Sequence, residues 1–170
     1  MSLYLRQLDN KICWEWGGAK DRYPWLLSGQ FPAAPLRDLK PSVNSSISIW
    51  FIEDDRSNLS RIAASVAAGR NTLDKFDYAL FEENLLTQVG VKLKKTEGGS
   101  KDTQANRDWH WDLIELTLDQ LFKLAQLIHQ SAVRDRFFDD EVAGFIEQAI
   151  KAGRIRRDSI NPRILARLPS

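Results

Sequence analysis

The chain contains one cysteine, two histidines and one methionine among its 170 residues. A single cysteine, Cys13, cannot form a disulfide within the chain or supply a cysteine-based zinc site. No apolar run reaches the length of about eighteen residues that a membrane-spanning helix needs. Residues 1–7 reach a charged side chain before an apolar segment of signal-peptide type can form. These absences favour a cytoplasmic protein.

The sequence also lacks the motifs that mark common enzyme classes. It has no Walker loop, no dinucleotide-binding glycine fingerprint, no nucleophile elbow and no zinc-protease motif. Its net charge of +1 excludes a chain that is cationic throughout. The composition, with 43% hydrophobic and 28% charged residues, is typical of a globular protein. We therefore expect no cofactor and no resident metal, and we favour a non-enzymatic role without excluding an enzyme.

Patterns typical of strands and helices alternate along the chain without an internal repeat. We therefore expect an α+β fold: one globular domain over residues 1–170, a mainly antiparallel sheet and three to four helices. Residues 24–46 are rich in proline but contain apolar anchors, which predicts an ordered irregular excursion. The expected strands cover residues 3–8, 11–16, 47–52, 76–80, 91–95 and 107–116. The expected helices cover residues 59–69, 81–89, 118–132 and 139–153.

Tryptophan is abundant, with six residues in the chain, and two of them lie in its most informative stretch, Arg107–Asp112. In a strand, Trp109 and Trp111 would share one face, because side chains alternate with a period of two residues. We predict that this tryptophan face packs on the core. The opposite face carries three candidate catalytic residues: Asp108, His110 and Asp112.

Geometry limits the chemistry of this face. Same-face neighbours on a strand are about 6.7 Å apart, so the two aspartates lie about 13 Å apart along the backbone. One metal ion binds its ligands at about 2 Å and cannot take all three side chains. His110 and one aspartate can share an ion only if other segments supply further ligands. The alternative is solvated aspartates beside a hydrogen-bonded structural histidine.

Arginine dominates the C-terminal segment, residues 151–170. The segment carries six basic side chains and one acidic side chain, and planar guanidinium groups grip two phosphate oxygens at once. Three partners fit such a segment: nucleic acid, an acidic protein, or acidic patches of the same domain. The candidate nucleic-acid or partner-binding residues are Arg154, Arg156, Arg157, Arg163 and Arg167.

Two functional hypotheses follow from these observations. The first is a small non-catalytic subunit or adaptor of a cytoplasmic multi-protein assembly, for which a nucleoprotein complex such as a CRISPR effector is an example by size and charge. It predicts a protein partner, nucleic-acid contact through the basic tail and no membrane. The second is a metal-dependent hydrolase or nuclease that uses His110 with Asp108 or Asp112.

Overall fold

The computed structural model describes residues 2–9, 33–42 and 44–169. The expected strand over residues 11–16 lies outside these ranges, as do residues 24–32 and 43 of the proline-rich excursion. None of the helices within them has the length and apolar character needed to cross a membrane. The elements follow in the order β1 (Leu3–Leu8), η3 (Ala34–Leu39), β2 (Ile47–Ile52), α2 (Leu59–Ala67), β3 (Phe76–Glu82), α3 (Glu83–Val89), β4 (Lys92–Lys95), α4 (Thr103–Trp109), β5 (His110–Ile114), α5 (Leu118–Ser131), β6 (Val133–Phe137), α6 (Asp139–Lys151), η4 (Arg157–Ser159) and α7 (Pro162–Leu165).

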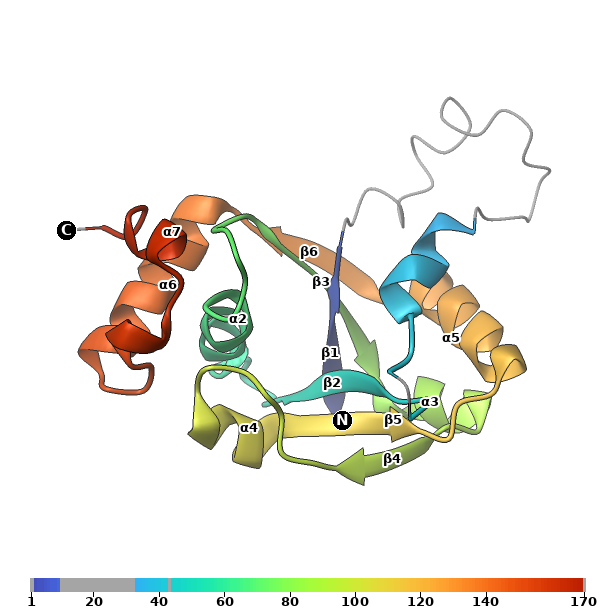
Figure 1. The fold of residues 1–170 in the computed structure, drawn as a ribbon. Coiled ribbons are helices and arrows are strands. Elements are labelled where there is room, and N and C mark those ends of the chain that lie inside the picture. The colour runs from blue at the N-terminus through green and yellow to red at the C-terminus, as the bar shows by residue number, and fades with distance from the viewer. Residues whose placement is uncertain (1, 10–32, 43, 170) are drawn as a thin grey trace.

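The described strands form one antiparallel sheet in the order β4-β5-β2-β1-β3-β6 (Figure 1). β1 lies in the interior of the sheet, between β2 and β3, although both follow it by tens of residues. The sheet is therefore assembled by long-range pairing, which brings distant segments side by side. The expected α+β class with a mainly antiparallel sheet is confirmed, and the described residues form six α-helices where the sequence predicts three to four.

Helices cover both faces of the sheet, and each face has its own hydrophobic core (Figure 1). α2 and α6 pack on one face, where they meet Leu5, Trp50 and Phe76. η3, α3 and α5 pack on the other face, against Tyr4 and Ile49. The alternation of side chains along each strand explains this division, because neighbouring residues such as Tyr4 and Leu5 point to opposite faces.

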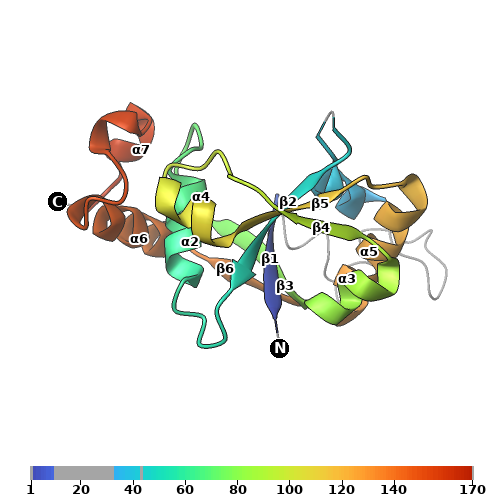
Figure 2. The same cartoon turned by 90° about the horizontal axis from the view of Figure 1, so that it is seen from below.

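The most consequential difference from the sequence-based prediction is α4. Residues 103–109 form a helix, so the polar loop ends earlier than expected and the strand β5 begins only at His110. The helix starts at Asp102, whose side chain accepts a hydrogen bond from the Ala105 amide over 3.0 Å. Only two residues of α4 are buried, so it has no apolar stripe that periodicity could reveal. Figure 2 shows α4 beside α2.

β6 is the second element that the sequence pattern does not predict. Its sequence, VRDRF, places charges between two apolar ends, which is typical of an exposed edge strand. The strand forms because it pairs with β3, and Arg136 donates two hydrogen bonds to the buried carboxylate of Asp77. Tertiary pairing therefore determines the structure of this segment.

Candidate functional site

His110 and Asp112 lie two residues apart on β5 and share one face of the sheet. The register of β2 places Trp50 opposite His110 and Ser48 opposite Asp112. On the other side, Lys94 of β4 lies opposite Asp112. Polar side chains of three neighbouring strands thus lie around His110, the candidate histidine predicted from the sequence.

A hydrogen-bonded chain links His110 to Asp112 through Thr96. The Thr96 hydroxyl oxygen lies 2.9 Å from Nδ1 of His110 and 2.9 Å from Oδ2 of Asp112. An ionised carboxylate only accepts hydrogen bonds, so the hydroxyl proton goes to Asp112 and the hydroxyl oxygen accepts from Nδ1–H. Ser48 donates to the other oxygen of Asp112 over 3.1 Å. The neutral imidazole therefore carries its proton on Nδ1, which leaves Nε2 as its basic nitrogen.

Burial keeps the His110 imidazole neutral. The residue is 5% exposed, and burial lowers its pKa below the ordinary value of 6.5, against the opposing charge of Asp112. Nε2 lies 4.0 Å from Asp112 Oδ1, which is too long for a hydrogen bond. At neutral pH the lone pair of Nε2 is thus available to accept a proton.

A cleft of about 330 Å³ opens beside His110. Its floor is formed by strands β1, β2 and β5, which contribute Arg6, Ser48 and His110. One wall is the C-terminal end of α2 with Val66 and the segment after it with Arg70, and the other is the loop between β4 and α4 with Ser100. This volume lies at the lower end of the range for small-ligand pockets.

The loop of residues 96–102 is fixed by polar contacts to α2 and α4. The hydroxyl oxygens of Ser65 on α2 and Ser100 lie 2.5 Å apart. The Asn106 side-chain amide of α4 donates to the Ser100 carbonyl over 3.0 Å, and the Asp102 amide donates to the Ser65 hydroxyl over 3.0 Å. Two helices therefore hold the loop that carries Thr96 and closes one side of the cleft.

Gly98 in this loop lies directly against the imidazole. A Cβ atom at this position would lie 2.8 Å from Cδ2 of His110 and 2.9 Å from Oδ1 of Asn106. Such distances are shorter than van der Waals contact, so only glycine allows the loop to approach this closely. The loop therefore contributes directly to the position of the imidazole ring.

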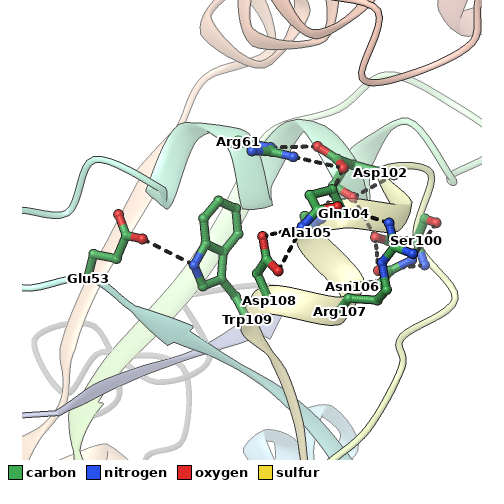
Figure 3. Close-up of polar contacts among 11 residues, drawn as sticks. Glu53, Arg61, Ser100, Asp102, Gln104, Ala105, Asn106, Arg107, Asp108 and Trp109 are labelled. Carbon is green, nitrogen blue, oxygen red and sulfur yellow. Dashed lines mark hydrogen bonds and ion pairs between the residues drawn. The ribbon is translucent and has the colours of Figure 1, made fainter.

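An ion pair between Arg61 and Asp102 anchors the start of α4 to α2 (Figure 3). Arg61 donates to the two carboxylate oxygens over 2.7 and 3.1 Å. The Asp102 side chain is 2% exposed, and burial raises its pKa. Hydrogen bonds from Arg61 and the Ala105 amide outweigh that effect and lower the pKa below 3.8. The carboxylate thus stays ionised and serves both the ion pair and the helix cap.

The two tryptophans of the Trp-His-Trp stretch lie on different faces of the sheet, and the prediction of a shared face is wrong. Trp109 ends α4, packs half-buried on the α2 side and donates its indole N–H to Glu53 over 3.2 Å (Figure 3). The guanidinium of Arg61 lies 5.0 Å from the centre of its ring. Trp111 packs half-buried on the opposite face, edge-on to Tyr4. The change from helix to strand between the two residues explains the difference.

Asp108 does not belong to the His110 face. It lies on α4, exposed to solvent, and accepts two hydrogen bonds from Gln104, each 2.8 Å long (Figure 3). The expected alternation of Asp108, His110 and Asp112 on one strand face is therefore wrong. Within the described ranges, no group of three or more histidine, cysteine, aspartate or glutamate side chains is arranged to hold a metal ion.

The C-terminal segment is folded onto the domain. It contains η4 and α7, and its isoleucines Ile155, Ile160 and Ile164 are buried in the same core as α2 and α6. Removal of residues 154–170 would therefore expose this core, so single substitutions are better probes of the arginines than truncation.

Three of the five candidate arginines pair with nearby carboxylates. Arg154 and Arg163 are exposed, and neither forms an ion pair among the residues that the structure describes. Contact of these arginines with nucleic acid stays a prediction. The ion pairs join Arg156 to Asp158, Arg157 to Glu147 and Arg167 to Asp139.

The role as a non-catalytic subunit also stays a prediction from the sequence. Leu118 and Phe122 are four residues apart on α5, with exposed fractions of 68% and 46%. Val133, the first residue of β6, and Phe138, which follows the strand, are also exposed. Exposed apolar side chains are common on protein surfaces, and only a large contiguous patch points to a partner.

Three residues of the candidate site were not predicted from the sequence: Arg6 and Arg70, which line the cleft, and Thr96, which contacts His110. Arg6 and Arg70 are single charges in otherwise apolar or turn-like surroundings. The sheet topology brings Arg6 to His110, and the packing of α2 on the sheet brings Arg70 there. The position of Thr96 in the sequence could have indicated its role, because it directly follows a strand that pairs with the histidine-bearing strand.

No protein-family model, curated protein or solved structure matches this chain. The functional argument therefore rests on the geometry of the site.

Proposed function

We propose that this protein is a hydrolase in which His110 accepts a proton from water through Nε2. The observation that carries the proposal is the chain from Asp112 through Thr96 to Nδ1 of His110, beside a cleft. A general base needs a fixed position, the correct tautomer and a neutral state at working pH. The hydrogen bonds supply the position and the tautomer, and burial supplies the neutral state.

Thr96 and Asp112 are positioning residues in this proposal. Asp112 is held by Ser48 and Thr96, and it stabilises the imidazolium that forms when Nε2 takes a proton. Hydrolases with a catalytic triad use the same arrangement: one group orients a histidine, and the histidine transfers the proton. In this protein the nucleophile is water. The proposal keeps His110 and Asp112 from the second sequence-based hypothesis and omits Asp108.

The first prediction concerns hydrolysis of two chromogenic substrates, p-nitrophenyl phosphate and p-nitrophenyl acetate. Loss of a general base lowers a rate by about 10²- to 10⁴-fold, so we expect His110→Gln to reduce the turnover of an accepted substrate by that factor. Since only the neutral imidazole accepts a proton, the wild-type rate should rise with pH. Its midpoint should lie below the ordinary histidine pKa of 6.5.

Two further variants make this test specific. Thr96→Val removes the hydroxyl and should lower the rate and move the midpoint of the pH profile, which a merely structural residue would not do. Asp108→Asn is the matched control, because Asp108 lies close in sequence but outside the cleft, and its rate should equal that of the wild type. Equal rates for wild type and His110→Gln on both substrates would contradict the proposal.

A further inference from the structure

The cleft contains two arginines that the proton transfer to His110 does not use. We infer that Arg6 and Arg70 bind the phosphate of a small phosphate monoester, which is the substrate of the proposed hydrolase. This inference rests on the proposed function, and it adds the substrate class. It is independent of the C-terminal arginines, which do not line this cleft.

Arg6 is held rigidly at the floor of the cleft. Its Nε and Nη2 atoms donate to the Asp38 carbonyl over 3.1 and 2.7 Å, and Nη1 donates to the Ser48 carbonyl over 2.8 Å. These contacts fix the plane of the guanidinium, and among the described residues they leave two of its five N–H groups for another acceptor. A preorganised guanidinium with two remaining donors is suited to a phosphate.

Arg70 lines the same cleft from the segment just after α2. Its Nη1 atom donates to the Lys75 carbonyl over 3.0 Å, and its guanidinium lies 5.2 Å from the centre of the Phe76 ring. Within the part of the chain that the structure describes, these contacts use only one of the N–H donors of Arg70 as a hydrogen-bond donor. Two separate elements thus place one guanidinium each at the same cleft.

The charges of these arginines are only partly compensated. Among the described residues, no carboxylate forms an ion pair with Arg6 or Arg70. Burial lowers the pKa of both guanidinium groups, although Asp9 and other nearby carboxylates act in the opposite direction. Arginine does not lose its proton in proteins. An anion bound in the cleft therefore compensates the free-energy cost of burying the two charged guanidinium groups.

Asp112 lies beside His110 but does not line the cleft, and its single negative charge stands against the positive charges of Arg6 and Arg70. Both of its oxygens accept hydrogen bonds, one from Ser48 and one from Thr96. A neutral imidazole adds no repulsion, and its Nε2 can accept a hydrogen bond from water. The small volume of the cleft favours a monoester over a nucleic-acid strand.

The reaction balances with these residues alone. Water gives a proton to Nε2 of His110 while its oxygen forms a bond to phosphorus. The ester P–O bond breaks, and its electron pair leaves with the alkoxide, which takes the proton back from Nε2. The products are an alcohol and inorganic phosphate. The two guanidinium groups stabilise the charge on the oxygens around phosphorus in the transition state.

Titration of the whole protein with inorganic phosphate, followed by heteronuclear NMR at low ionic strength, tests the inference. We expect saturable binding that shifts the His110 signals. Loss of a charge-assisted hydrogen bond weakens an anion site by about 10-fold or more, and we expect that loss for Arg70→Gln. Arg70→Lys keeps the charge but not the planar fork, and should weaken binding less. Arg154→Gln, which removes an equal charge outside the cleft, should bind like the wild type.

The outcomes separate this inference from the proposed function. Saturable binding that Arg70→Gln weakens, in a variant with wild-type melting temperature, supports the phosphate site even if no ester is hydrolysed. Absence of saturable binding, or equal weakening by Arg154→Gln and Arg70→Gln, overturns it. Hydrolysis of p-nitrophenyl acetate without phosphate binding supports the role of His110 and overturns the phosphate-monoester assignment.

Discussion

Asp102→Ala should lower the free energy of unfolding by about 3 kcal/mol, because it breaks a buried ion pair and removes a helix cap at once. The carboxylate accepts from Arg61 and from the Ala105 amide, and it is almost fully buried. The partial exposure of the Arg61 side chain, 21%, limits the cost, because water can reach the abandoned guanidinium. For a chain of this size the change corresponds to a fall in Tm of about 6 to 12 °C.

Two controls divide this effect into its parts. Asp102→Asn keeps a good N-cap but loses the charge. Its free energy of unfolding should therefore lie between those of the wild type and Asp102→Ala. Asp108→Ala removes an exposed carboxylate from the same helix and should change stability by less than about 0.5 kcal/mol. Equal stability of Asp102→Ala and Asp108→Ala would show that the ion pair does not anchor α4.

The stabilising effect of Asp102 should also depend on pH in a defined direction. Its pKa in the folded protein lies below the ordinary value of 3.8, so its stabilising contribution is complete above that value. The contribution disappears as the pH falls through the lower folded pKa. Urea unfolding at neutral and strongly acidic pH should therefore show a large difference between wild type and Asp102→Ala only at neutral pH.

Gly98→Ala should disturb the candidate site strongly. The added Cβ meets the His110 ring and Asn106 at distances below 3.0 Å. Overpacking of this kind costs about 1–3 kcal/mol. The imidazole or the loop must move, so the hydrogen bond from Nδ1 to Thr96 should be lost, and with it most of the hydrolytic rate and the wild-type His110 chemical shifts.

The neighbouring glycine provides a matched control for this prediction. A Cβ at Gly99 meets no atom within 4 Å, so Gly99→Ala should leave the stability and the His110 signals nearly unchanged. Indistinguishable spectra and rates for the two variants would mean that the loop does not position His110.

The sequence predicts those elements whose local pattern agrees with their place in the fold. The alternating apolar residues of β2 give its bounds, 47–52, as the structure has them. The Thr117 and Gln120 capping box starts α5 as predicted. α4 and β6 escape prediction because contacts from elsewhere stabilise them, namely Arg61 on Asp102 and the pairing of β6 with β3. Local propensity is a weak guide where tertiary contacts decide the structure.

In the candidate site, too, local patterns predict some residues, and tertiary contacts determine the others. The spacing of His110 and Asp112 on one strand predicts their common face, and the structure places them there. Asp108 was misplaced because the strand begins one residue after Trp109. Arg6 and Thr96 join the site through the order and register of β1, β2, β5 and β4, and Arg70 joins it because α2 packs on the sheet. No local pattern specifies either arrangement.

The central claim is that His110 is a neutral base with its free lone pair on Nε2. Long-range ¹H–¹⁵N NMR of the imidazole nitrogens across a pH titration tests it most directly. Because the chain has two histidines, His129→Gln assigns the signals. We expect a neutral ring protonated on Nδ1, with a pKa below 6.5 that shifts when Thr96→Val removes the hydroxyl. A ring protonated on Nε2 at neutral pH, or charged there, would contradict it.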